Sequence, residues 1–106
     1  MKILFDQGTP LPLRRSLTGH TVDIPSRKGW SRLRNGNLLD VAEQESYQVL
    51  ITMDRSLRYQ QNLAHRSVSI IVLMKASWPR IRRHVQEIAN VVNSIEPGQV
   101  MEIEIG

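Results

Sequence analysis

Two aspartates each stand directly after a short apolar run, and this placement points to chemistry at one edge of a sheet. Asp6 follows residues 2–5, and Asp54 follows residues 49–53. Such runs are typical of buried parallel strands, and open α/β sheets bind ligands just beyond the carboxyl ends of their strands. Two carboxylates about 5 Å apart repel each other by a few kcal/mol at an effective dielectric constant of about 20, unless a cation or proton intervenes. The pair therefore predicts a metal site.

Each aspartate also has a purely structural interpretation. Asp54 precedes a polar segment that can form a helix, and as its cap it would contribute about 1 kcal/mol. Asp6 can accept hydrogen bonds from the backbone of the turn at residues 7–9. For either residue alone the structural role is favoured, whereas two aspartates at neighbouring strand ends favour a site.

Alternating strands and helices are expected to position these residues. The pattern predicts strands at residues 2–5, 21–24, 49–52, 68–74 and 100–105, and helices at 9–19, 36–46, 56–62 and 78–95. Thr9 and Pro10 are expected to open the first helix, and the last strand, which alternates apolar residues with Glu102 and Glu104, is expected at a sheet edge. If the first strand lies between the second and third, Asp6 and Asp54 flank the point where the chain reverses direction in the sheet.

Length and composition limit the remaining possibilities. The chain has 106 residues, of which 41% are hydrophobic and 23% charged, and this fits one domain over residues 1–106. It contains no cysteine, which excludes disulfides, thiolate metal sites and cysteine nucleophiles. No apolar run is long enough to cross a bilayer, so we expect a cytoplasmic protein without a membrane partner.

The charge balance favours nucleic acid as a partner. Fourteen basic residues against ten acidic ones give a formal net charge of +4. The basic segment at residues 27–34 surrounds Trp30, whose ring could stack on a base while its neighbours bind phosphates. A solvated surface and a Trp30 that plugs the core are the competing interpretations.

Three stretches together resemble small bacterial PIN-like proteins related to the Mut7-C group. They are residues 1–10 (MKILFDQGTP), 35–43 (NGNLLDVAE) and 49–63 (VLITMDRSLRYQQNL), and the resemblance covers essentially the whole chain. It implies a reduced PIN-like three-layer sandwich, with a mostly parallel sheet of about five strands and helices on both faces. In such proteins, acids at the strand ends and at the start of a mid-chain helix hold Mg²⁺ or Mn²⁺.

The sequence matches the metal-binding pattern of these proteins only in part. Asp6 and Asp54 match the first and the late acid, but Gln7 and Asn35 stand where relatives commonly carry acids. Mg²⁺ usually takes one or two carboxylates together with water and phosphate oxygens. One weakly held Mg²⁺ or Mn²⁺ is therefore expected, because a second ion would need more negative charge.

The resemblance implies a metal-dependent endoribonuclease that serves as the toxin of a toxin–antitoxin pair. Asp6 and Asp54 would bind the metal, with Asn35 assisting, and water would be activated to attack an RNA phosphodiester. The substrate-binding residues expected are Arg55, Arg58, Gln7, Trp30, Arg32 and Arg34. The alternative is a scaffold that has lost too many acids and binds RNA or protein without catalysis. Expected partners are RNA, an antitoxin protein encoded nearby and, as a homodimer, a second copy of the chain.

Overall fold

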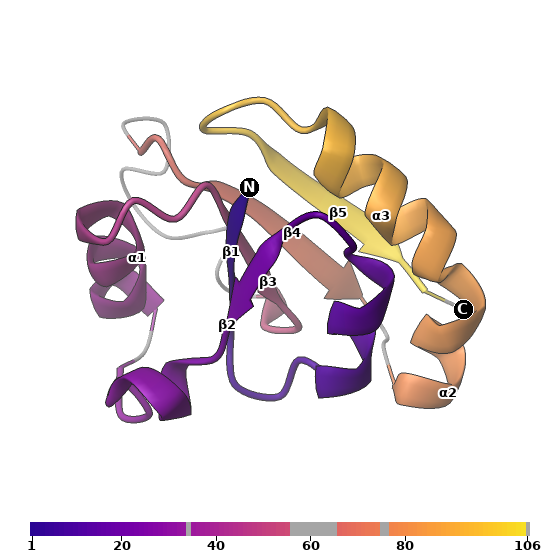
Figure 1. Ribbon diagram of the computed structural model, residues 1–106, viewed down its shortest axis with the longest axis horizontal. Helices are drawn as coiled ribbons and strands as arrows, with labels where there is room; N and C mark the ends of the chain where they lie inside the picture. The colour runs from indigo at the N-terminus through magenta and orange to yellow at the C-terminus, as the bar shows by residue number, and fades with distance from the viewer. Residues whose placement is uncertain (34, 56–65, 75–76, 106) are drawn as a thin grey trace.

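A parallel β-sheet forms the centre of the molecule. The computed structural model describes residues 1–33, 35–55, 66–74 and 77–105. The strands are β1 (Lys2–Phe5), β2 (Thr21–Asp23), β3 (Val49–Thr52), β4 (Ser69–Met74) and β5 (Val100–Glu104). Every neighbouring pair is parallel, and the order is β2-β1-β3-β4-β5 (Figure 1). The α/β class is confirmed, as is the placement of the first strand between the second and third.

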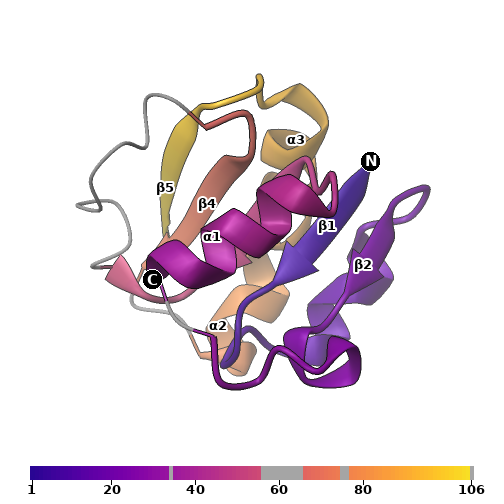
Figure 2. The same ribbon diagram turned by 90° about the vertical axis from the view of Figure 1, so that its left-hand side faces the viewer.

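Helical segments lie on both faces of the sheet, which gives three layers. One face carries η1 (Leu11–Ser16), α2 (Trp78–Ile81), η5 (Arg82–His84) and α3 (Val85–Ser94), and α1 (Asn35–Gln44) lies across the other (Figure 2). The first face buries Ile3, Phe5 and Ile51 with apolar side chains of η1 and α3. The second buries Leu4 and Leu50 with those of α1. Alternate residues of each central strand thus enter separate cores, as the pleat requires.

The burial of the strands follows their sequences. All four residues of β3 are buried, as are the first five residues of β4, which agrees with their unbroken apolar runs. In β5, Ile103 is buried while Glu102 and Glu104 are exposed. Its alternation matches its place at the edge of the sheet, as expected.

The first helical segment differs from its prediction. It is the 3₁₀ helix η1, which begins at Leu11 after Pro10 and has no side-chain cap. Thr9 does not cap it, because the Thr9 hydroxyl donates a hydrogen bond to the carbonyl oxygen of Ile51 at 3.1 Å. The amides of Leu13 and Leu17 donate to the carbonyl oxygens of Pro10 and Arg14, three residues earlier, at 3.1 Å each, which is the hydrogen-bond pattern of a 3₁₀ helix.

The long helix expected at residues 78–95 is divided. A 3₁₀ turn, η5, separates α2 from α3. The turn tightens the chain to about three residues per turn, and the apolar side chains on either side of it, Ile81 and Ile88, still enter one core. The third predicted helix, residues 56–62, lies outside the described residues. Within the described part of the chain, none of the helices has the length and apolar character needed to cross a membrane.

Candidate functional site

The two predicted strand ends lie side by side. Strands β1 and β3 are paired with Phe5 opposite Ile51, and the Asp6 amide donates to the Ile51 carbonyl oxygen at 2.9 Å. Asp6 therefore lies next to Thr52, the last residue of β3, and Asp54 follows two residues later. The prediction that both aspartates lie at one edge of the sheet is confirmed.

A hydrogen-bonded unit joins the two aspartates through Thr52. The Thr52 hydroxyl donates to Oδ2 of Asp6 at 2.8 Å and accepts the backbone N–H of Asp54 at 3.0 Å. The other carboxylate oxygen of Asp6, Oδ1, accepts the backbone N–H of Gln7 at 2.8 Å. Because a hydroxyl has one proton and two lone pairs, the proton of Thr52 is directed to Asp6. The Asp6 carboxylate is thus held from both sides.

The neighbouring crossovers leave this edge in opposite directions. The connection from β1 to β2 runs through η1 on one face, and the connection from β2 to β3 runs through α1 on the other (Figures 1 and 2). Open α/β sheets bind ligands at such a topological switch point. Asp6 is half buried here and Asp54 is exposed, so both can be reached from solvent.

Asp6 and Asp54 are the acidic residues that follow the ends of β1 and β3 and could serve as ligands of a divalent cation. Each Asp6 oxygen accepts one hydrogen bond from the groups named above and retains a further lone pair, and Asp54 supplies a second carboxylate. Among the described residues there is no group of three or more His, Asp or Glu side chains that could hold a metal. Two carboxylates suit one Mg²⁺ or Mn²⁺ completed by water and phosphate oxygens.

The other predicted site residues lie at the same end of the sheet where they are described. Asn35 begins α1, Gln7 follows Asp6, and Arg55 follows Asp54. Arg32 is exposed in the segment that connects β2 to α1. Arg34 and Arg58 lie outside the described residues.

Trp30 has a packing role in addition to its predicted one. It is half buried against the α1 core, and its ring meets the ring of Tyr47 edge to face, with centroids 6.1 Å apart. The Tyr47 hydroxyl donates to Asp23 at 2.6 Å, and the Lys28 ammonium lies 3.9 Å from the same carboxylate. These contacts attach the basic segment to the sheet, which supports the plug interpretation of Trp30 and leaves its stacking role a prediction.

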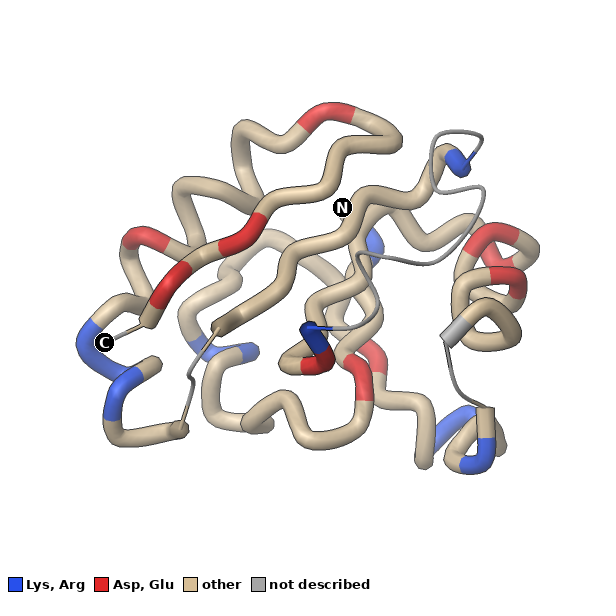
Figure 3. The backbone as a smooth tube through the Cα atoms, turned by 180° about the vertical axis from the view of Figure 1, so that it is seen from behind, with Lys and Arg blue, Asp and Glu red and all other residues tan. Residues whose placement is uncertain are grey.

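Charge is distributed unevenly between the two ends of the sheet. Cations follow the carboxyl ends of the strands, whereas most acids lie at the other end or on α1 and β5 (Figure 3). The described cations toward the carboxyl end are Arg27 and Lys28 of η2 (Pro25–Lys28), Arg32, Arg55, Arg80 of α2, and Arg82 and Arg83 of η5. Asp6 and Asp54 share this end of the sheet with these cations and with two further acids, Asp23 and Glu104, the last residues of β2 and β5.

Thr52 and Thr9 were not predicted to belong to the site. Both are buried, and both use their hydroxyls at the junction of β1 and β3. Threonine is common in strands, so its presence at the end of β3 carries no signal for a site. Its hydrogen-bond partner can be identified only when the register of β1 against β3 is known.

Comparison with known proteins gave no matching family model, no matching curated protein and no matching solved structure. The resemblance to PIN-like proteins stays a prediction.

Proposed function

We propose that the chain is a metal-dependent endoribonuclease whose reaction centre lies at the carboxyl ends of β1 and β3. The observation that carries the proposal is the unit formed by Asp6, Thr52 and Asp54. A carboxylate held by two donors keeps one orientation, and such preorganisation is what metal ligands require of their supporting groups. The two aspartates also lie at the topological switch point, the position at which open α/β sheets bind ligands.

The surrounding cations support a phosphate-containing substrate. Arg27, Arg32 and Arg55 are exposed in segments that follow β2 and β3. Basic groups near a strand end attract a nucleic acid backbone and release its counterions. The helix α1 begins at Asn35 and has no acidic residue in its first turn, which also favours an anion there.

The chemistry follows from these parts. Asp6 and Asp54 would hold one Mg²⁺ or Mn²⁺, which, when bound, polarises a phosphoryl oxygen and lowers the pKa of water. Water would attack the phosphorus and lose a proton to solvent, the bond from phosphorus to the leaving ribose oxygen would break, and that oxygen would take up a proton from solvent. Thr52 keeps the Asp6 carboxylate in place, and Arg55 and Arg32 bind phosphates on either side of the cleaved bond.

The resemblance to PIN-like proteins supplies the biological setting that we propose, a toxin with an antitoxin protein encoded nearby. Induced expression should arrest growth of a bacterial host, and expression of Asp6→Asn should not. Growth arrest by both versions at equal protein levels would contradict a toxic ribonuclease.

A binding scaffold without catalysis is the second candidate. It is favoured by the absence, among the described residues, of any group of three acids or histidines that could hold a metal. Gln7 and Asn35, in place of acids, point the same way. Such a scaffold would bind RNA equally well with and without a divalent cation.

Cleavage of an end-labelled single-stranded RNA separates the two candidates. If the chain is a nuclease, cleavage should require Mn²⁺ or Mg²⁺ and stop in chelator. The cleavage rate should fall at least about 100-fold in Asp6→Asn and in Asp54→Asn, because loss of a direct ligand should cost no less than loss of an outer-shell partner, which costs up to about 100-fold. Glu45→Gln removes an exposed carboxylate beyond α1 and should cleave like the wild type. Metal-independent binding without cleavage would establish the scaffold, and cleavage that survives both aspartate variants would refute the site.

A further inference from the structure

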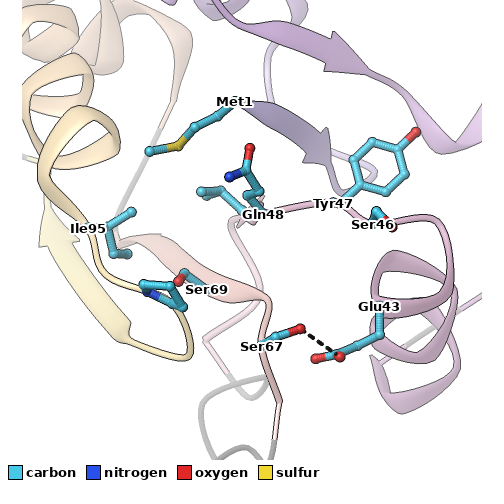
Figure 4. A pocket seen from close by; sticks show the side chains of 10 residues that line it. Met1, Glu43, Ser46, Tyr47, Gln48, Ser67, Ser69 and Ile95 are labelled. Atoms are coloured by element: carbon cyan, nitrogen blue, oxygen red, sulfur yellow. Dashed lines mark hydrogen bonds between the residues drawn. The ribbon is translucent and has the colours of Figure 1, made fainter.

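A cavity opens at the amino edge of the sheet, where the strands begin, at the end opposite Asp6 and Asp54. Its volume is about 360 Å³, and its described lining comes from the end of α1, the starts of β3 and β4, and the turn after α3 (Figure 4). That volume suits a small organic molecule. Neither Asp6 nor Asp54 lines it.

One wall of the cavity is apolar. Met1, Val49, Ile95 and Pro97 line it, and Figure 4 shows Met1 and Ile95 on the side away from Glu43. Val49 and Ile95 are also part of the buried core, so this wall rests on rigid packing. An aliphatic segment of a ligand would be desolvated against it.

Three hydroxyl groups of the lining, those of Ser67, Ser69 and Tyr47, already donate their protons within the protein. Ser67 donates to Oε2 of Glu43 at 2.9 Å, and Ser69 donates to the carbonyl oxygen of Glu96. Tyr47 donates to Asp23, and burial together with this bond raises the pKa of Tyr47. Because each hydroxyl has a single proton, Ser67 and Ser69 can offer only lone pairs to a ligand.

Glu43 gives the cavity a negative charge. Its Oε1 accepts the backbone N–H of Val68 at 3.1 Å, and its Oε2 accepts the Ser67 hydroxyl. Burial raises the pKa of Glu43, but these hydrogen bonds and the nearby Arg66 outweigh burial and lower it. The carboxylate is therefore ionised at neutral pH, and each oxygen has a lone pair beyond the bond named here.

The cations near the cavity are held by groups that do not line it. The Arg66 guanidinium lies 2.9 Å from Asp40, and the amino group of Met1 lies 3.1 Å from Nδ1 of His20. The Lys2 ammonium donates to the Glu45 carbonyl oxygen and lies 4.3 Å from the centroid of the Tyr47 ring. The Glu43 carboxylate is thus the charged side chain that faces the cavity among its described lining residues.

We propose that this cavity binds a primary ammonium group carried on a short aliphatic chain. Glu43 and Ser67, which are hydrogen-bonded to each other, offer lone pairs to the ammonium, and the apolar wall receives the chain. The amino group of Met1, a lining residue, already contacts His20, so an anion would face the Glu43 carboxylate, the charged side chain of the lining. A neutral alcohol brings only one donor. Binding at this cavity does not depend on the proposed nuclease function.

The test is a titration of the isotope-labelled protein with pentylammonium chloride, followed by backbone amide NMR. The amides of Val68 and Ser69 should shift, and pentylammonium should bind at least about 10-fold more tightly than 1-pentanol, since hydrogen bonds to charged groups are stronger. Pentanoate, of similar shape and opposite charge, should not bind. Titration at constant ionic strength removes the contribution of bulk salt.

Glu43→Gln supplies the matched variant, because it keeps the size of the side chain and removes the charge. If it folds, it should lose the preference for pentylammonium over 1-pentanol, and retention of that preference would overturn the proposal. If it does not fold, the three ligands on the wild type still decide. Absent shifts at Val68 and Ser69, or binding of 1-pentanol or pentanoate as tight as that of pentylammonium, would overturn the proposal too.

Discussion

The two edges of one parallel sheet, where the strands end and where they begin, present different groups to solvent. At the carboxyl edge, Asp6 and Asp54 lie among segments rich in arginine, and Thr52 joins them. At the amino edge, Glu43 and serine oxygens line a cavity from which the nearby cations are drawn away. We propose phosphate with a divalent cation as the ligand of the carboxyl edge and an organic cation as the ligand of the amino edge. A well-formed cavity in a small α/β domain thus need not lie where its strand-end carboxylates meet.

The largest expected effect concerns two glycines at the amino edge, Gly19 just before β2 and Gly98 just before β5. Gly98 has φ +75°, and a Cβ there would lie 2.8 Å from the Arg66 carbonyl oxygen, whereas Gly19 has φ +84° and nothing within 4 Å. Gly19→Ala should cost about 1 to 2 kcal/mol of unfolding free energy, for the left-handed backbone alone. Gly98→Ala should cost about 2 kcal/mol more, because the amino edge must also move.

Urea denaturation of both variants measures these costs. Under conditions in which the Gly98→Ala variant is folded, its metal affinity at the carboxyl edge should equal that of the wild type. Equal destabilisation by the two substitutions would show that the turn at Gly98 accommodates a Cβ without an additional steric cost.

Thr52 should control the carboxyl edge without taking part in the reaction. Thr52→Val removes the donor to Asp6 and the acceptor of the Asp54 amide, so Mn²⁺ affinity should fall about 10- to 100-fold. Thr52→Ser keeps the hydroxyl and should restore most of the affinity. In the metal-free protein, hydrogen exchange of the Asp54 amide should accelerate in Thr52→Val alone. If Thr52→Val and Thr52→Ser bound Mn²⁺ with the same affinity, the Thr52 hydroxyl would have no role in the site.

The basic residues at the carboxyl edge should determine how strongly RNA affinity depends on salt concentration. Replacing Arg27 and Arg32 by glutamine should reduce the slope of log affinity for single-stranded RNA against log salt by about 0.7 for each phosphate that the variant no longer neutralises. Arg66→Gln removes a cation that pairs with Asp40 away from this edge, and its slope should match the wild type. RNA binding measured by fluorescence anisotropy at several salt concentrations decides, and a slope that falls equally in all variants would contradict a basic carboxyl edge.

The smallest effect concerns pH at the amino edge. Because the pKa of Glu43 is lowered from 4.5, its carboxylate stabilises the folded chain above that pH, and the contribution is lost as the pH falls through the folded value. Glu43→Gln should therefore cost about 1 kcal/mol at pH 7 and less below pH 4. Denaturation midpoints across this range test the sign, and a difference that grows on acidification would contradict it.

The candidate site was partly predictable because its signal is local. An apolar run that ends in an acid predicts both the strand and the position of the carboxylate, and parallel neighbours bring such ends together. Asp6 and Asp54 could be placed at one edge in this way. The role of Thr52 could not, because it depends on which residue of β1 lies opposite Ile51.

Features made by distant segments were not predictable. The cavity combines the ends of α1 and α3 with the starts of β3 and β4, and no single stretch of sequence carries it. Trp30 among cations left a stacking surface and a core plug as alternatives, and the contact of its ring with Tyr47 could not be predicted from the sequence. The break at η5 leaves the spacing of Ile81 and Ile88 intact, so the apolar pattern does not reveal it.

A Mn²⁺ titration followed by paramagnetic broadening of backbone amide signals compares the two edges directly. We expect the Gln7 and Asp54 amides, which donate to Asp6 and Thr52, to broaden first. The Val68 and Ser69 amides, near Glu43, should stay sharp, and Asp6→Asn should abolish the broadening at Gln7 and Asp54. Broadening that begins at Val68 and Ser69, or that persists at Gln7 in Asp6→Asn, would contradict a metal site at the carboxyl edge.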